Sequence, residues 1–289
     1  MQFLGVRGST PAPGAEFAGY GGHTSCIAVT RDGDDRPTLV LDAGTGLRSL
    51  TELLDGSPFH GSIVLSHLHW DHMQGLPFFV AGDTDSARVD LYLPAQEHRS
   101  GRDLLAQSLS PPSFPITPEG LRGAWGFHAI GDGRHDVESF VVTAVDIEHK
   151  GGRTFGLRVD GDRRSLAYLP DHAPEAGVSA RLMAMLDRVD VLVHDAQFLE
   201  PERPRAVDFG HSTVEDSIKL AHACGAGTLV LFHHSPVRTD AELDEIAAWA
   251  PQLAGDLVLV VAREGSVLEV AQPGSVEKPN SPTFRQNRL

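Results

Sequence analysis

Residues 66–75 read SHLHWDHMQG and place three histidines and an aspartate within six positions, at His67, His69, Asp71 and His72. The apolar residues just before them predict a buried strand that ends at the motif. Residues two apart point in nearly opposite directions on a helix, but they share a side of an extended chain. His67 and His69 are therefore expected on a loop that leaves the strand. Imidazoles and a carboxylate are typical ligands of zinc or manganese, so this stretch predicts a metal site.

Further His and Asp side chains follow other apolar runs, just past their carboxyl ends. His149, Asp171, Asp195 and His233 each come directly after such a run. Sites in layered α/β proteins gather where strands end, so one edge of a sheet is expected to collect these side chains. One ion takes about four ligands. The candidates suit two ions, and they are His67, His69, Asp71, His72, His149, Asp171 and His233.

Apolar runs that read as strands recur between helical patterns in both halves of the chain. They lie at 26–29, 38–41, 62–65, 89–93, 139–147, 154–159, 165–169, 189–193, 228–232 and 256–261. This mixture predicts an α/β fold with two sheets packed face to face and helices outside them.

Helix starts are clearest late in the chain, where Ser212–Glu215 and Thr239–Glu242 both fit a capping box. These helices are expected to end near Cys224 and Trp249. The proline-rich stretch 108–123 predicts a long loop. We expect a single domain over residues 1–272 and a flexible, polar tail over 273–289.

Composition narrows the functional classes. The chain has 289 residues and a net charge of −15, which opposes binding to polyanions, and we find no basic block typical of nucleic-acid binding. No apolar segment is long enough to span a membrane, and the first residues do not resemble a secretion signal. The two cysteines, Cys26 and Cys224, are too few for a disulfide framework. A cytoplasmic location is expected.

The His-x-His-x-Asp-His motif, with His149, Asp171 and His233 following in order, resembles the metallo-β-lactamase superfamily. The resemblance runs from LGVRGS at 4–9, through LDAGTG at 41–46, to FHH at 232–234. It implies a four-layer αβ/βα sandwich with the metal site at one edge. GHST at 210–213 and HDAQF at 194–198 are similar to the phosphodiesterase branch, which contains ribonuclease Z and a phosphoribosyl cyclic phosphodiesterase.

The resemblance also implies a role for each residue. His67, His69 and His149 are expected to hold one ion, and Asp71, His72 and His233 the other, with Asp171 between the two. The ions, expected to be Zn²⁺ or else Mn²⁺, share a hydroxide that attacks the phosphodiester. His211, supported by Asp195, is expected to protonate the leaving group, and the start of the following helix to favour a phosphoryl oxygen.

Residues around this set are expected to support it. Asp42 and Ser66 are expected to hold ligand histidines in one orientation. Arg7, Lys150 and Arg153 are weaker candidates for contact with substrate phosphate.

Four functions remain open. The first is hydrolysis of a small or cyclic phosphodiester. The second is tRNA 3′-end processing, against which stand the acidic charge, Asp195 in the place of a family glutamate, and no recognisable basic, glycine-rich arm. The third is hydrolysis of a lactone, thioester or β-lactam, which does not require the Asp195–His211 pair. The fourth is a metal-bound regulator or diiron protein. Assembly as a homodimer is an expectation from the family.

Overall fold

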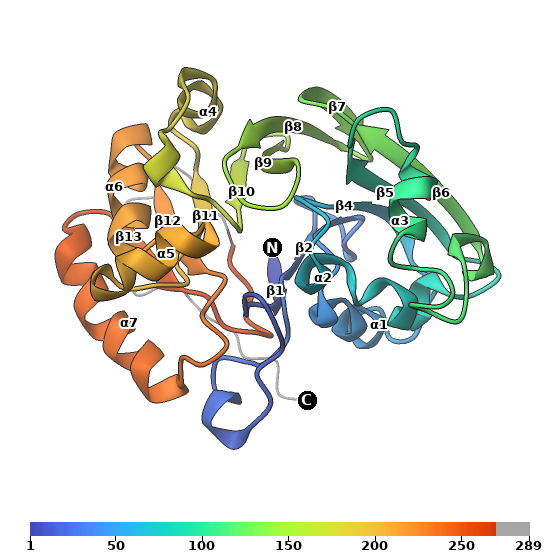
Figure 1. Ribbon diagram of the computed structural model, residues 1–289, viewed down its shortest axis with the longest axis horizontal. Helices are drawn as coiled ribbons and strands as arrows, with labels where there is room; N and C mark the ends of the chain where they lie inside the picture. Colours follow the sequence, from blue (N-terminus) through green and yellow to red (C-terminus); the bar gives the residue numbers. More distant parts are fainter. Residues whose placement is uncertain (270–289) are drawn as a thin grey trace.

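The computed structural model describes residues 1–269, which form two β-sheets packed face to face with helices on both outer sides (Figure 1). The first sheet has the strand order β1-β2-β3-β4-β5-β6, and the second has the order β13-β12-β11-β10-β9-β8-β7. The predicted four-layer αβ/βα sandwich is confirmed.

The strands are β1 (Gln2–Gly5), β2 (Cys26–Val29), β3 (Leu39–Leu41), β4 (His60–Val64), β5 (Arg88–Pro94), β6 (Ala124–Ile130), β7 (Gly133–Val137), β8 (Phe140–Ile147), β9 (Thr154–Asp160), β10 (Ser165–Leu169), β11 (Val191–Asp195), β12 (Thr228–Phe232) and β13 (Val258–Val261). The α-helices are α1 (Ser49–Leu53), α2 (Trp70–Met73), α3 (Gly101–Ala106), α4 (Ala180–Leu186), α5 (Arg203–Phe209), α6 (Val214–Cys224) and α7 (Asp240–Ala254). Short 3-10 helices lie at Ala15–Phe17, Thr45–Arg48, Leu76–Phe78, Val80–Gly82, Pro118–Gly120, Pro174–Ala176 and Glu200–Glu202.

Alternation along the strands produces the layers. In β3, Leu39 and Leu41 belong to the core between the sheets, whereas Val40 packs among the helices that cover the first sheet. In β12, Val230 faces the same inner core and Leu229 packs against the helices on the second sheet. Successive strand residues point to opposite faces, so strands covered on both sides read as continuous apolar runs.

The parallel strands decide where the loops meet. Strands β3 to β6 run parallel in the first sheet, and β10 to β13 run parallel in the second. The loops after β4, β10 and β12 all enter the region between the two halves, where α2 also lies (Figure 1).

All ten apolar runs predicted as strands are strands, with ends that agree to within two residues. The strands that sequence reasoning missed are β1, β6 and β7. Each lies at the edge of its sheet, and β6 and β7 carry several exposed or half-buried residues. In β6 and β7 these residues weaken the apolar pattern, whereas β1 has three buried residues out of four and is short.

The helix predictions need one correction. The capping box of α7 is Thr239 with Glu242, as predicted, but the box of α6 is Thr213 with Asp216 and not Ser212 with Glu215. The Ser212 hydroxyl instead donates to the carbonyl of His172, so it links two loops. Helix α6 ends at Cys224 as predicted, whereas α7 continues beyond Trp249 to Ala254.

The predicted loop at 108–123 is confirmed, because its only regular element is the 3-10 turn Pro118–Gly120. The expected tail at 273–289 and the domain boundary at 272 lie outside the described residues. Within residues 1–269, the helices are all too short or too polar to cross a membrane.

Candidate metal centre

Loops from both sheets bring the predicted ligands to one place. His67, His69, Asp71 and His72 lie in the loop after β4 and in the first turn of α2. From the second sheet, His149 lies just after β8, Asp171 just after β10 and His233 directly after β12. All seven predicted ligands meet here, although sequence separations of up to 166 residues lie between them.

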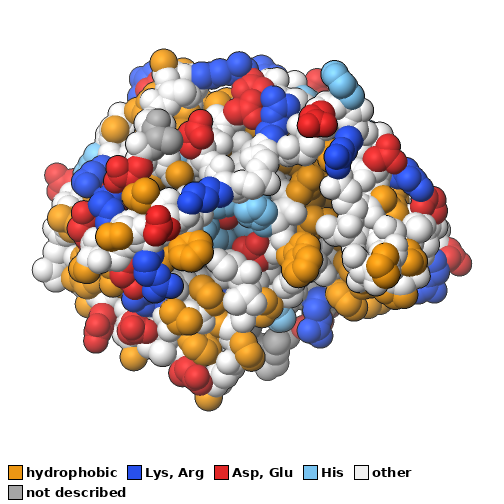
Figure 2. Space-filling view, viewed as in Figure 1, with side chains coloured by type: hydrophobic (Ala, Val, Ile, Leu, Met, Phe, Trp, Pro, Cys, Tyr) orange, Lys and Arg blue, Asp and Glu red, His pale blue; other side chains and the backbone are white. Residues whose placement is uncertain are grey.

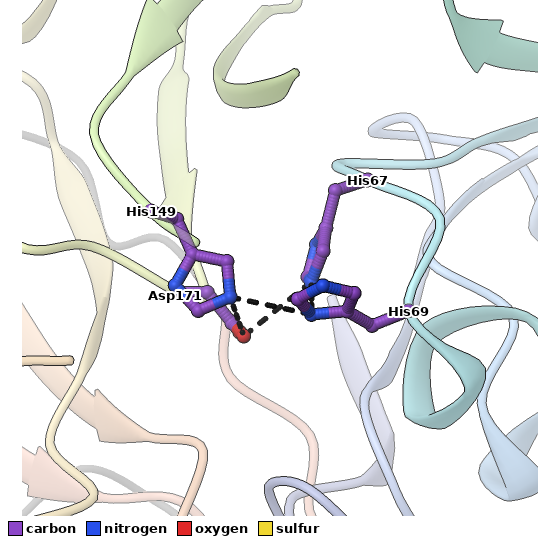
Figure 3. Close-up of side chains that lie close together, drawn as sticks. All are labelled: His67, His69, His149 and Asp171. Atoms are coloured by element: carbon purple, nitrogen blue, oxygen red, sulfur yellow. Dashed lines mark hydrogen bonds and ion pairs between the residues drawn. The ribbon is translucent and has the colours of Figure 1, made fainter. Parts of the chain in front are cut away.

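The first cluster consists of His67, His69, His149 and Asp171, with one potential ligand atom of each within 4.8 Å of the others (Figure 3). His67 Nε2 lies 2.9 Å from His69 Nδ1, which is 3.3 Å from His149 Nε2. Oδ2 of Asp171 lies 3.5 Å from His67 Nε2 and 3.3 Å from His149 Nε2. Two histidines of this cluster come from the first half of the chain, and the other two residues from the second.

The second cluster consists of Asp71, His72 and His233. Oδ2 of Asp71 lies 3.1 Å from His72 Nε2 and 3.3 Å from His233 Nε2. The other carboxylate oxygen of Asp171, Oδ1, lies 3.2 Å from His72 Nε2 and 3.0 Å from His233 Nε2. Asp171 therefore presents one oxygen to each cluster.

These separations fit metal coordination. Tetrahedral zinc bonds of about 2.0–2.1 Å place neighbouring donor atoms about 3.3–3.4 Å apart, close to the separations in both clusters. The buried Nε2 of His72 and Oδ1 of Asp171 have no hydrogen-bond partner among residues 1–269. Buried polar atoms normally have hydrogen-bond partners. These two unpaired atoms are potential metal ligands, so they fit a site for divalent cations.

Burial keeps the first-cluster histidines in the form that binds metal. It lowers the pKa of His67 far below the ordinary value, and it also lowers the pKa of His69 and His149. Neighbouring imidazoles add to the effect on His67. A neutral imidazole offers a lone pair to a cation, so the site favours metal binding over protonation.

Asp42 organises the histidines of both clusters. Its Oδ2 accepts hydrogen bonds from Tyr168 Oη at 2.8 Å and Ser66 Oγ at 2.8 Å, and it pairs with His72 Nδ1 at 2.7 Å. Ser66 Oγ also pairs with His67 Nδ1 at 3.0 Å. With Nδ1 engaged in this way, Nε2 of each histidine is free to face the clusters.

Asp42 and Ser66 therefore lie where the sequence analysis expected them, whereas the contribution of Tyr168 was missed. Tyr168 is the one residue with a phenol hydroxyl in the buried strand SLAYL, and this was the signal available in the sequence.

His211 and Asp195 form a buried pair beside the clusters. Asp195 Oδ2 pairs with His211 Nδ1 at 2.9 Å and accepts backbone N–H bonds from His172 and Ser212, both at 3.2 Å. The His211 ring centroid lies 5.2 Å from that of His233. Burial alone would lower the pKa of His211, but the carboxylates of Asp195, Asp171 and Asp71, with Asp195 contributing most, outweigh it and raise the pKa to about 9.

The helix start after His211 is not an open anion site. The backbone N–H of Thr213 donates to its capping partner Asp216, and that of Val214 donates to the carbonyl of Phe198. The expectation that this helix end favours a phosphoryl oxygen is wrong, because these N–H groups already have partners.

Two of the weaker candidates also have structural partners. Arg7 is fully buried and donates to the carbonyls of Gly21, Ser235 and Arg238, so it fixes the loop that carries His233. It does not face substrate. Arg153 pairs with Asp146 at 2.7 Å.

Comparisons with known proteins agree with this geometry. The model of the beta-lactamase superfamily domain matches residues 38–234. Ribonuclease Z of Haloarcula marismortui is 25% identical over 96% of this chain and 98% of its own length. Ribonuclease Z of Pyrobaculum arsenaticum is 41% identical over 70% of this chain and 78% of its own length.

Solved structures share the fold. The metallo-beta-lactamase fold protein YhfI from Bacillus subtilis has a TM-score of 0.68 at 15% identity, covering 91% of this chain and 96% of its own. Human tRNase Z, short form, has a TM-score of 0.66 at 21% identity, covering 94% and 99%. A diphosphatase from the PhnP family has a TM-score of 0.65 at 21% identity, covering 91% and 94%. The chain therefore belongs to the metallo-β-lactamase superfamily, in the phosphodiesterase branch with ribonuclease Z, and is a metal-dependent hydrolase.

Proposed function

We propose that the two clusters hold two zinc ions and that the protein hydrolyses phosphodiesters. His67, His69 and His149 would hold one ion, Asp71, His72 and His233 would hold the other, and Asp171 would contribute an oxygen to each. Imidazole-rich sets with few carboxylates suit zinc, and manganese is the second choice. Bound there, the ions supply Lewis acidity for the phosphoryl oxygens and make a water acidic enough to act as a nucleophile near neutral pH.

The protein's own part in the reaction is to supply a proton to the leaving group. Nδ1 of His211 is engaged by Asp195, so Nε2 is the atom that protonates the leaving alkoxide. Asp195 fixes the orientation and tautomer of this ring and stabilises its charged form. The pairing of Asp195 with His211 next to the clusters is the observation that carries the proposal, because ester and lactam hydrolysis do not require this pair.

The first candidate substrate is an RNA 3′ segment. Its support is the set of relatives named ribonuclease Z, two of which match over nearly their full length. The sequence analysis placed a small or cyclic phosphodiester ahead of RNA, and the relatives favour the reverse order.

The small or cyclic phosphodiester remains the second candidate because of two observations. The net charge of −15 opposes a polyanion. The sequence also contains no recognisable basic, glycine-rich arm, and between His149 and Asp171 the chain forms only the β9–β10 hairpin.

One panel of substrates separates the candidates. Protein with measured metal content is assayed on a precursor tRNA, on a 2′,3′-cyclic nucleotide, on bis(4-nitrophenyl) phosphate and on a lactone. Precursor cleavage at catalytic concentration supports the first candidate, and turnover of the small diesters alone supports the second. Lactone turnover without phosphodiester turnover would overturn the proposal, as would a protein that binds zinc and hydrolyses nothing.

A further inference from the structure

Two exposed aromatic residues lie in the chain directly beside residues of the metal centre. Trp70 is 74% exposed and Phe209 is 56% exposed, which is unusual for rings of this size. We call these two residues the aromatic rim. In Figure 2, hydrophobic side chains stand on both sides of the opening at which histidines are visible.

Trp70 belongs to the ligand loop itself. It is the first residue of α2, between His69 of the first cluster and Asp71 of the second. Both neighbours are part of the metal centre, and Asp71 is buried, yet the indole is turned to solvent. Trp70 is therefore the direct sequence neighbour of one residue from each cluster.

Phe209 reaches the same centre from the other half of the chain. It is the last residue of α5, and the next residue, Gly210, accepts a 2.7 Å hydrogen bond from His149 Nδ1 through its carbonyl. His211 follows directly. The rings of His69 and His149 have centroids 5.0 Å apart. Trp70 follows His69 in the chain, and Phe209 precedes Gly210, which bonds His149, so each rim residue is joined in sequence to a residue at this imidazole pair.

We propose that the aromatic rim stacks on a nucleobase attached to the scissile phosphodiester, so that the enzyme selects nucleotide substrates. This inference rests on the proposed phosphodiesterase function. Bases stack on exposed aromatic rings regardless of base identity, as in proteins that bind single strands. A chain with 39 acidic and 24 basic side chains offers little general attraction to phosphates, so base stacking supplies affinity that charge does not.

The test compares two substrates with the same leaving group, thymidine 5′-(4-nitrophenyl phosphate) and methyl 4-nitrophenyl phosphate. The wild-type enzyme is expected to prefer the thymidine ester. Trp70→Ala is expected to lower kcat/KM for that ester about 10-fold, chiefly through KM, and to leave the methyl ester within about twofold. Phe209→Ala is expected to have a smaller effect of the same kind, and Trp70→Phe to retain most of the preference.

Phe78→Ala is the matched control. Phe78 is 57% exposed, but it contacts Phe114 and lines a separate hollow with Arg48 and Val80. This variant is expected to keep the wild-type preference. A second readout does not depend on turnover: AMP is expected to quench the fluorescence of the wild-type protein and not the emission of Trp70→Phe, whereas ribose 5-phosphate quenches neither.

The outcomes are distinguishable. If wild-type protein with two metals hydrolyses neither ester, the proposed function fails. If it hydrolyses both and the rim variants keep the same preference, the function stands and the rim inference is overturned. Rim variants that only change the oligomeric state in light scattering would also overturn it, because they would show that a second copy covers these rings.

Discussion

The two halves of the molecule contribute to the metal centre in different ways. The first sheet supplies four of the seven proposed ligands from one stretch of six residues, 67–72, after a single strand. The second sheet supplies His149, Asp171 and His233 from three separate strand ends, and also the Asp195–His211 pair. The four ligands at 67–72, the compact set, lie together on one loop because they are neighbours in sequence. His149, Asp171 and His233, the dispersed set, come together only through the pairing of strands β8 to β12.

The two sets are also held in place by different residues. The compact set is held by Asp42, which lies at the end of β3 and ties the loop to the strands through Ser66, His72 and Tyr168. The dispersed set is held by Asp195 and by backbone bonds between loops. Substitutions in each set therefore test which half of the molecule controls metal binding and which controls the rate of the reaction.

The largest effect is expected for Asp171→Asn, because this carboxylate faces both clusters. Losing its charge is expected to reduce bound zinc below one ion per chain and to lower kcat/KM about 1000-fold or more, since several kcal/mol of electrostatic stabilisation disappear. Elemental analysis and phosphodiester kinetics measure both. Asp162→Asn, at an exposed carboxylate paired with Arg31, is the matched control. Two tightly bound ions in Asp171→Asn would contradict the bridging role.

His211→Gln comes next, and it separates chemistry from metal binding. The change is expected to lower kcat by about 100- to 1000-fold with both ions retained, because only proton transfer is lost. His211, Asp171 and His233 also lie close enough together that they could hold a metal ion. Loss of one ion in this variant would therefore make His211 a ligand and not an acid.

Asp42→Asn tests the support of the compact set. An amide cannot accept bonds from Tyr168, Ser66 and His72 as the carboxylate does, so zinc affinity is expected to fall about 10- to 100-fold. Competition with a chelator measures this. Tyr168→Phe removes only one of these bonds, so its effect should be smaller. Equal losses of zinc affinity in the two variants would show that the hydrogen bond from Tyr168 provides most of the support.

The smallest effect is expected for Ser217→Ala, which lies behind the dispersed set. Its hydroxyl donates to the carbonyl of Asp195 at 2.6 Å and pairs with His194 Nδ1 at 2.9 Å. Removal of this hydroxyl is expected to lower the free energy of unfolding by about 1–2 kcal/mol and to lower kcat by less than about threefold. Denaturant titration measures the first and steady-state kinetics the second. A large fall in kcat without loss of stability would give Ser217 a role in positioning Asp195.

Sequence reasoning reached the buried strands because both of their faces are apolar, and it missed β6 and β7 because several of their residues are exposed or half-buried. It also missed β1, which is buried on both faces but is only four residues long. The helix start at residue 213 was placed one residue early, since Ser212 and Thr213 are both good caps. Which of them caps the helix is decided by a tertiary contact, the bond from Ser212 to the His172 carbonyl.

The sequence by itself determined the superfamily, the residue types of the metal centre and the compact set at 67–72, because a short motif restricts its own geometry. Only the tertiary structure decided that Asp171 faces both clusters, that Tyr168 supports Asp42, and that Arg7 is buried away from substrate. These facts depend on atoms brought together from distant parts of the chain. Strand register and packing control such contacts, and no local pattern records them.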